Sequence, residues 1–415
     1  MTIQKTTLSN GLTIATDNIP NFETVSIGMF VKVGAINENI QNNGVSHFVE
    51  HMAFKGTSKR SALQISEAIE NVGGYINACT GKEITAFYAK VLKGDSKLAI
   101  DVITDIVQDS SFDRDEFEKE RGVIIQEIKQ YEDTPDDVVF DIFQRKCFED
   151  QSLGRSILGP ESNILSFENT VLKDYLKDNY SASKMILSAS GNIEHERFVD
   201  LANEYIDKLQ SFDTKNPDIQ KYVGGSIHQY KDIEQSHIIV GFEGVSHYDE
   251  NRYVASIMST ILGGGMSSRL FQEVREKRGL AYSIFSYMSH YADTGIFGIY
   301  AGSDTSKTME VARIIKDVLE NFSYTINESE IIRAKNQMKA SLLMGLESSS
   351  TRMERMSHQY LIHDRFIDPK EISKKIDDVE IEDIVSFARS IIKSKPTVAL
   401  VGREDNTEKI YEVFI

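Results

Sequence analysis

The feature that most constrains the fold of this chain is the segment HFVEH at residues 47–51. If the segment is helical, His47 and His51 lie four residues apart, so both imidazoles project from one face, and Glu50 lies on the same face. Such a helix must pack against a core on one side and leave space on the other, where two imidazoles can bind one metal ion. The alternative is a pair of surface histidines beside a solvated glutamate. The opposite face is apolar and consists of Val45, Phe48, Val49 and Met52.

A second predicted helix offers a further ligand. A catalytic zinc ion binds three protein ligands and keeps a fourth position for water. Asp113 and Glu116 are typical of a helix N-terminus, and Glu120 and Glu127 lie two turns apart on one face of the helix that follows. Only one of these carboxylates can reach the metal, while the other is suited to orienting an imidazole. Taken alone, the same helix is also typical of an acidic, solvated surface.

Two stretches carry a resemblance to a known family. GVSHFVEHMAFKGT at 44–57 and ERGVIIQE at 120–127 resemble the metal-binding segments of the pitrilysin-type inverzincin metallopeptidases. The nearest branch is the one that holds the β subunit of mitochondrial processing peptidase and its short bacterial relatives. In that family a glutamate ligand follows the histidine pair at a similar spacing, and Glu127 lies 76 positions after His51. The resemblance extends over essentially the whole chain.

The resemblance implies a role for each of these residues. His47, His51 and Glu127 would bind one Zn²⁺ per chain, Glu50 would be the general base, and Glu120 would orient a ligand imidazole. Zinc lowers the pKa of its bound water and polarises the scissile carbonyl, and the base takes the water proton and passes it to the leaving amine. The resemblance therefore predicts a zinc metalloendopeptidase.

No nucleophilic side chain is required by this chemistry. Cys79 and Cys147 are the only cysteines and have no C-x-x-C spacing. We interpret both as small buried hydrophobic residues, and two cysteines in this length indicate no disulfide framework.

A strand after the second predicted helix points to a peptide substrate. Gly73 and Gly74 end that helix, and residues 75–80 are typical of a strand. In the resembled family the matching strand lies at the edge of its sheet and takes up the substrate as an additional strand, which favours binding through main-chain hydrogen bonds. Asn77 and Ala78 match the family's residue pair there, although the segment is also typical of an internal strand.

Two residues in the second half match substrate contacts of the family. Arg275 and Tyr282 lie seven positions apart, after a glycine run at 263–265 that fits neither common phosphate-loop pattern. By resemblance, Arg275 would donate to a substrate carbonyl and Tyr282 would stabilise the oxyanion. The alternative is a surface charge and a packing tyrosine.

Specificity residues are suggested at three further positions. Pro135 predicts the start of a helix on which Asp137 and Asp141 share one face. In processing peptidases an acidic pair at these positions binds an arginine upstream of the cut, although the first is often glutamate. Acidic residues also favour a helix N-terminus for electrostatic reasons alone. Phe54, after the metal helix, is assigned to an apolar pocket beyond the cut.

Composition excludes some classes of protein. The net charge is −17, which argues against a general nucleic-acid binder and favours a basic peptide. No run of eighteen apolar residues is present, so we predict no membrane span. No positively charged segment followed by an apolar one precedes the predicted hairpin at 7–14, which favours a cytoplasmic location and leaves a periplasmic or organellar one open.

The order of predicted elements indicates an internal duplication. Strands, two helices, a strand pair and further helices occur once in each half, but residues 253–257 of the second half replace the metal helix. We predict an α+β fold of two homologous domains, 1–212 and 218–415, divided in a polar stretch. Each would be a mostly antiparallel sheet covered by helices on one face, and the two together would form half of a clamshell.

The resemblance also has a consequence for assembly. Family members close four such domains around the peptide, so a chain of two implies a second chain, most simply in a C2 homodimer. Arg275 and Tyr282 of one chain would then face the zinc of the other. The predicted substrate is an extended, basic, presequence-like peptide, and the alternatives are general oligopeptide degradation and a non-catalytic partner subunit.

Overall fold

The computed structural model describes residues 3–415, which form two compact units. The first unit contains the chain up to Ile128, together with Ser156–Asp218 and Leu343–Ile367, and the second contains the remaining segments. The predicted division into 1–212 and 218–415 concerns the duplicated halves and stays a prediction. The compact units differ from it because the segments 129–155 and 343–367 are exchanged.

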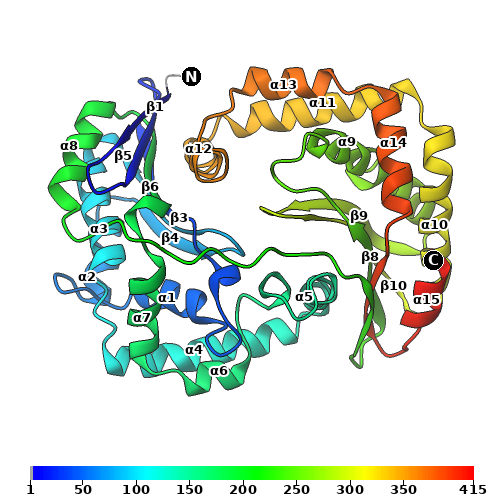
Figure 1. The fold of residues 1–415 in the computed structure, drawn as a ribbon, viewed down its shortest axis with the longest axis horizontal. Coiled ribbons are helices and arrows are strands. Elements are labelled where there is room, and N and C mark those ends of the chain that lie inside the picture. The colour runs from blue at the N-terminus through cyan, green and yellow to red at the C-terminus, as the bar shows by residue number, and fades with distance from the viewer. Residues whose placement is uncertain (1–2) are drawn as a thin grey trace. The chain divides into compact units, whose positions relative to one another are not determined.

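The sheet of the first unit has six strands in the order β1-β2-β6-β3-β5-β4 (Figure 1). Only β2 and β6 pair in parallel, and β4 lies at the edge, paired with β5 alone. The strands are β1 (Ile3–Thr7), β2 (Thr13–Asn18), β3 (Thr24–Val31), β4 (Tyr75–Thr80), β5 (Thr85–Leu92) and β6 (Met185–Gly191).

Helices cover one face of this sheet and enclose the larger core of the unit. Phe48, Ile103, Phe117 and Phe198 are fully buried in that core, with the inward residues of β3 and β5. The helices are α1 (Val45–Ala53), α2 (Ala62–Glu70), α3 (Ser96–Gln108), α4 (Arg114–Glu132), α6 (Glu161–Ser166), α7 (Asn169–Asn179) and α8 (His195–Tyr205).

The sheet of the second unit has five strands in the order β7-β11-β8-β10-β9. Only β7 and β11 pair in parallel. The strands are β7 (Gly225–Tyr230), β8 (Gln235–Glu243), β9 (Ala281–His290), β10 (Gly295–Asp304) and β11 (Thr397–Gly402). The helices are α9 (Arg252–Gly263), a π-helix (Phe271–Glu276), α10 (Thr308–Thr325), α11 (Glu328–Gly345), α13 (Pro369–Asp377), α14 (Ile381–Ile392) and α15 (Thr407–Phe414).

The two sheets repeat one topology. Without β1, the order β2-β6-β3-β5-β4 matches β7-β11-β8-β10-β9 strand for strand, and the parallel pair occupies the same place in both. Helix α9 follows β8 as α1 follows β3, and it carries neither histidine nor glutamate. The two mostly antiparallel sheets with helices confirm the predicted fold class, and within residues 3–415 the candidate metal ligands lie in the first unit.

Each sheet also carries one helix on its second face, which the sequence did not predict. Helix α12 (Ser349–His363) packs on β2, β3 and β6 of the first sheet, and α5 (Pro135–Cys147) packs on β7, β8 and β11 of the second. A glycine in the central strand permits each approach. A Cβ on Gly28 would lie 3.2 Å from the side chain of Met353, and one on Gly241 would lie 2.5 Å from Phe143. Each crossing helix comes from the other half of the chain.

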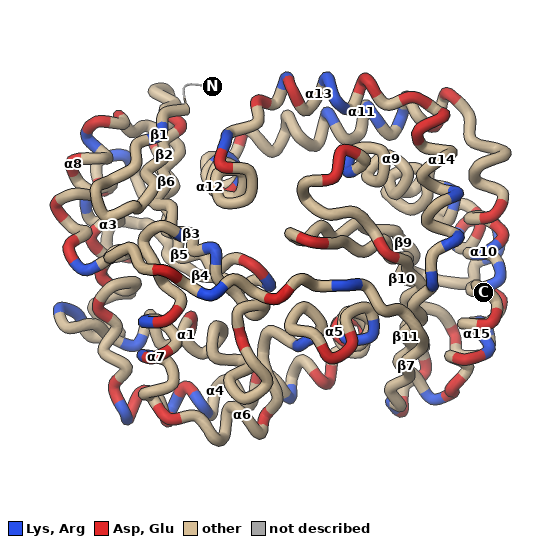
Figure 2. The backbone as a smooth tube through the Cα atoms, in the orientation of Figure 1, with Lys and Arg blue, Asp and Glu red and all other residues tan. Residues whose placement is uncertain are grey.

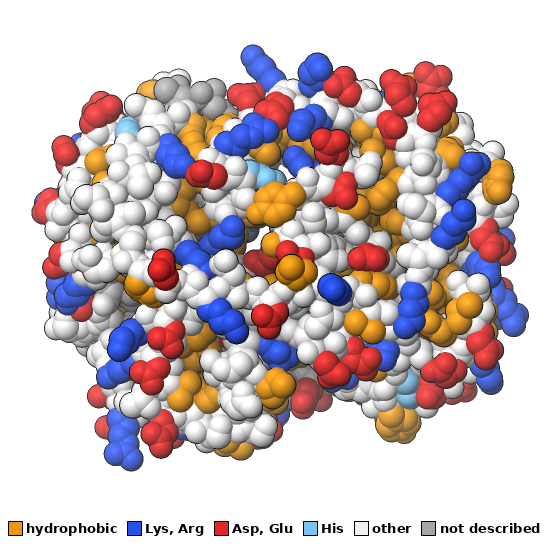
Figure 3. Space-filling model, in the orientation of Figure 1, with side chains coloured by type: hydrophobic (Ala, Val, Ile, Leu, Met, Phe, Trp, Pro, Cys, Tyr) orange, Lys and Arg blue, Asp and Glu red, His pale blue; other side chains and the backbone are white. Residues whose placement is uncertain are grey.

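Charged residues of both signs alternate along the surface elements, as in α13 (Figure 2). On the face shown in Figure 3, acidic and basic side chains are likewise mixed. Among residues 3–415 no helix combines the length and the apolar character that crossing a bilayer requires.

Candidate metal centre

Helix α1 and helix α4 bring three potential ligands together in the first unit. The rings of His47 and His51 lie 4.6 Å apart between centroids. His47 Nε2 is 3.7 Å from Glu127 Oε1, and His51 Nε2 is 3.4 Å from Glu127 Oε2. One ligand atom from each residue lies within 4.8 Å of the others. The predicted ligand set is therefore assembled at one point.

The distances suit a zinc ion. Zinc–nitrogen and zinc–oxygen bonds of about 2.0–2.1 Å in a tetrahedron place neighbouring ligand atoms about 3.3 Å apart, close to the separations found here. His47 Nδ1 is buried without a hydrogen-bond partner. Burial, and secondarily the charge of His51, lowers the pKa of His47 to about 4, so the ring is neutral at neutral pH and Nε2, the nitrogen on the side of Glu127, can bind a metal.

Glu120 orients the second imidazole. Its Oε2 lies 3.0 Å from His51 Nδ1, and Lys55 Nζ lies 2.6 Å from its other oxygen. A proton on Nδ1 that is donated to this carboxylate leaves the lone pair of His51 Nε2 free on the side of Glu127. Glu120 thus contacts the imidazole predicted to bind metal, and Glu127 reaches both rings.

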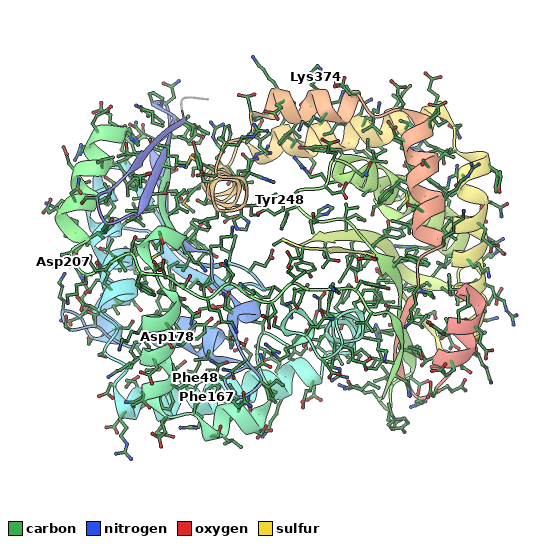
Figure 4. The ribbon with its side chains drawn as sticks, viewed as in Figure 1. Phe48, Phe167, Asp178, Asp207, Tyr248 and Lys374 are labelled. Atoms are coloured by element: carbon green, nitrogen blue, oxygen red, sulfur yellow. The ribbon has the colours of Figure 1, made fainter. Side chains whose placement is uncertain are left out.

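Aromatic packing aligns the two helices. The rings of Phe48 in α1 and Phe117 in α4 stack with centroids 4.5 Å apart and planes 5° apart. Phe167 lies beside Phe48 at 6.3 Å (Figure 4). The Arg121 guanidinium lies 5.0 Å from the Phe117 ring and donates to the main-chain oxygens of Ile164 and Phe167. Packing of the apolar face of α1 against α4 therefore fixes where Glu120 and Glu127 lie relative to His47 and His51.

A buried carboxylate holds the first turn of the metal helix. Glu38 Oε2 accepts from the backbone N–H of Gly44 at 2.9 Å and from Asn43 Nδ2 at 2.8 Å, and Oε1 accepts from the N–H of Ser46 at 2.8 Å. These bonds satisfy donors that a helix N-terminus leaves free. Gly44 has φ +101°, and a Cβ there would lie 2.8 Å from the oxygen of Leu158, so glycine is required.

Glu50, the predicted general base, has a raised pKa. Burial raises the pKa of its carboxyl and the charge of Glu127 adds to this, while hydrogen bonds from Thr80 and the charge of His51 oppose it. A carboxylate beside a metal-bound water needs a pKa close to the working pH to accept and release a proton. Burial of Glu50 shifts its pKa in that direction.

The edge strand next to Glu50 has a free side. Ala78 is buried in the core, and its backbone N–H donates to the side-chain oxygen of Asn77 at 2.9 Å. That N–H is thus covered by the preceding side chain and not by β5, so a peptide carbonyl could take its place. Phe54, at the end of α1, is partly buried against the core.

The residues assigned to substrate contact in the second half lie together within the second unit. The Arg275 guanidinium lies 4.8 Å from the Tyr282 ring and 4.8 Å from the Phe271 ring, and Tyr282 is 78% exposed. Their contact with a reacting peptide stays a prediction.

Asp137 and Asp141 of α5 lie close to Tyr131 at the end of α4. The Tyr131 hydroxyl donates to the backbone oxygen of Asp137 at 2.9 Å. Burial raises the pKa of this hydroxyl, and the charges of Asp141 and Asp137 raise it further. Asp137 and Asp141 lie one helical turn apart on α5, and their binding of an arginine stays a prediction.

One interpretation of the sequence was wrong. Cys147 is fully buried, but Cys79 is exposed, because β4 lies at the sheet edge and Cys79 points away from the core. Three residues at the site were missed, namely Glu38, Lys55 and Thr80. Lys55 lies just beyond the end of α1, and no local pattern in the sequence marks either Lys55 or Glu38.

Known protein families and curated proteins match this chain over most of its length. The family model described as insulinase (peptidase family M16) matches residues 13–161, and the model described as peptidase M16 inactive domain matches residues 166–338. A protein of Bacillus subtilis named uncharacterized zinc protease YmxG is 36% identical over 408 residues, covering 97% of this chain and 99% of its own. The mitochondrial-processing peptidase subunit beta of Saccharomyces cerevisiae is 35% identical over 409 residues, covering 94% and 88%.

A solved structure also shares the fold. The crystal structure of a protease from Helicobacter pylori superposes with a TM-score of 0.91 at 22% identity, covering 96% of this chain and 99% of that one. At this identity the likeness concerns the fold alone.

Proposed function

The chain belongs to peptidase family M16, whose curated relatives are named zinc proteases, and we propose that it is a zinc-dependent endopeptidase that cleaves extended, basic peptides. The observation that carries the proposal is the convergence of His47, His51 and Glu127 beside a general base with a raised pKa. The non-catalytic alternative is disfavoured because every residue of the centre is present.

The proposed mechanism assigns one task to each residue. When bound, zinc would lower the pKa of a water molecule and polarise the substrate carbonyl. The Glu50 carboxylate accepts the water proton and then gives it to the amine that leaves. Glu120 keeps the His51 tautomer fixed during the reaction. No covalent intermediate with the protein is required.

The proposed substrate is a peptide in extended conformation. A strand that pairs with β4 takes its affinity mainly from main-chain hydrogen bonds, beginning with the N–H of Ala78. The net charge of −17 favours basic peptides electrostatically. Asp137 and Asp141 would bind an arginine upstream of the cut, and Phe54 would line an apolar site beyond it.

We further propose that the active form is a homodimer that encloses the peptide in a chamber. Arg275 and Tyr282 of one chain would then donate to the carbonyl and the oxyanion at the zinc centre of the other. The yeast relative named a processing-peptidase subunit supports assembly with a partner chain.

Metal analysis combined with peptide cleavage tests the function. The purified protein should contain one zinc per chain and cleave peptides in a chelator-sensitive way, while Glu50→Gln should keep the zinc and lose cleavage. No zinc and no cleavage in the wild type would overturn the proposal. Equal cleavage of peptides with and without an upstream arginine would favour general oligopeptide degradation.

A further inference from the structure

The edge strand β4 presents two different faces. Side chains alternate along a strand, so Ile76 and Ala78 turn to the core, whereas Tyr75, Asn77 and Cys79 turn to the opposite face and are exposed. The Tyr75 hydroxyl lies 3.4 Å from Ser350 Oγ of α12. A peptide added to β4 would therefore place every second side chain on the face where α12 lies.

The position of α12 over this face is well defined. Ser349 Oγ lies 2.8 Å from Ser26 Oγ, and Ser357 Oγ lies 2.6 Å from Ser188 Oγ. Arg352 Nε donates to the buried Asp17 carboxylate at 2.6 Å. Because buried polar contacts of this kind are made only when the partners are in register, α12 is held in one place on the sheet.

Glu354 projects from α12 and has no partner in residues 3–415. It follows the core residue Met353 but is itself exposed. No hydrogen bond or ion pair joins it to any described side chain, although partial burial raises the pKa of its carboxyl. Arg352, two residues earlier, is already paired with Asp17. Glu354 is thus a carboxylate with free acceptor capacity.

Its charge reaches the peptide-binding edge. Burial raises the pKa of the Cys79 thiol, and the charges of Glu50 and Glu354 raise it further. Glu354 also contributes to the raised pKa of Tyr88 on β5, after burial and Cys79. Ser350, which contacts Tyr75 of β4, lies one helical turn before Glu354 on the same face of α12, so Glu354 lies on the side of α12 that faces β4.

We propose that Glu354 is a specificity-determining residue that selects a lysine or arginine side chain at the peptide position facing α12 next to Cys79. A basic side chain gains a charge-assisted hydrogen bond to a carboxylate that otherwise lacks a partner, and an acidic one is repelled. The inference rests on the proposed peptidase function. It is independent of Asp137 and Asp141, because those residues belong to the second unit.

A peptide series tests the selection. In each peptide, one position around the cut carries arginine, its neutral isostere citrulline, or glutamate, and the other positions are kept constant. In the wild type, kcat/KM should favour arginine over citrulline at one position. Glu354→Gln should reduce that ratio about three- to tenfold, a typical range for one partly exposed ion pair, and Glu354→Lys should favour glutamate there. The matched control Glu347→Gln, at an exposed carboxylate just before α12, should leave the ratio unchanged.

Binding to an inactive variant separates the two proposals. Fluorescence anisotropy of the same peptides is measured with Glu50→Gln, with and without Glu354→Gln. Arginine preference in binding that disappears with Glu354→Gln supports the selection even when the wild type cleaves nothing, an outcome that would overturn only the peptidase. If the wild type cleaves peptides and Glu354→Gln leaves the arginine-to-citrulline ratio of kcat/KM unchanged at every position, the selection alone is overturned. Zinc content and thermal unfolding confirm that each variant is folded.

Discussion

His51 Nδ1 lies 3.0 Å from Glu120 Oε2, and Glu120 is almost fully buried. Lys55 Nζ contacts the other oxygen of the carboxylate at 2.6 Å. The lysine therefore compensates the charge of Glu120, while Oε2 stays bonded to the His51 ring. The arrangement determines which ring nitrogen carries the proton and which can bind metal. In the proposed metal centre, Glu120 would therefore act through His51.

Glu120→Gln should weaken zinc binding about 10- to 100-fold, the usual cost of removing such a partner. A glutamine can still accept a hydrogen bond, but it brings no charge to polarise the imidazole and leaves Lys55 unpaired. Competition with a chelator of known affinity measures the change. The control is Glu116→Gln on the same helix, whose pair with Lys119 is exposed and should not affect zinc. If Glu120→Gln and Glu116→Gln both bind zinc as tightly as the wild type, Glu120 has no role at the metal.

Glu38→Gln should destabilise the metal-free protein by about 2 kcal/mol, because the glutamine replaces one of the two accepting oxygens with an NH2 group that faces the buried donors at the start of α1. Urea unfolding followed by far-UV circular dichroism measures the change. Glu70→Gln, at an exposed position of α2, should stay within about 0.5 kcal/mol of the wild type. An unchanged midpoint for Glu38→Gln would show that Glu38 does not hold the helix.

The metal-free protein should lose stability as pH falls below 6.5. Burial lowers the folded-state pKa of His47 to about 4, whereas the unfolded chain has the ordinary value of about 6.5. Between these values the unfolded state binds more protons, so the contribution is complete above pH 6.5 and is lost progressively down to pH 4. Burial also lowers the pKa values of His195, His237 and His290, which act with the same sign.

Unfolding free energies at pH 7 and pH 5 test this linkage. The loss attributable to His47 is about 2 kcal/mol over this interval, and it should be absent from His47→Gln. If the unfolding free energies of wild type and His47→Gln change by the same amount between pH 7 and pH 5, burial does not lower the pKa of His47.

Local patterns in the sequence predicted the metal helix and the presence of two candidate carboxylates, because helical spacing alone decides which side chains share a face. The choice of Glu127 over Glu120 as ligand came from the family resemblance, and the structure supports it by placing Glu127 at both rings. The roles of Glu38 and Met353 could not be predicted. Each role depends on contacts between segments far apart in the chain, such as the packing of Met353 in α12 against Gly28. The local sequence carries no signal for such contacts.

Arg352→Met should destabilise the protein by roughly 3 kcal/mol, because it leaves the Asp17 carboxylate buried without its charged partner. Asp17 is 1% exposed and Arg352 Nε lies 2.6 Å from it. Thermal unfolding measures the effect. The double variant Asp17→Asn, Arg352→Met should recover part of the loss, since no buried charge remains. Without any recovery, the cost of the single variant would come from packing and not from the unpaired charge.

Mixing two inactive variants should restore activity if the site is completed between chains. One variant is Glu50→Gln, which keeps Arg275 and Tyr282, and the other carries Arg275→Ala and Tyr282→Phe, which keeps Glu50. Random pairing makes half of the dimers mixed, and each mixed dimer has one complete site, so about a quarter of the wild-type activity is expected from a C2 homodimer. Native mass spectrometry verifies that mixed dimers form. If they form and activity stays at the level of the separate variants, each chain completes its own site and the exchange of Arg275 and Tyr282 between partners is wrong.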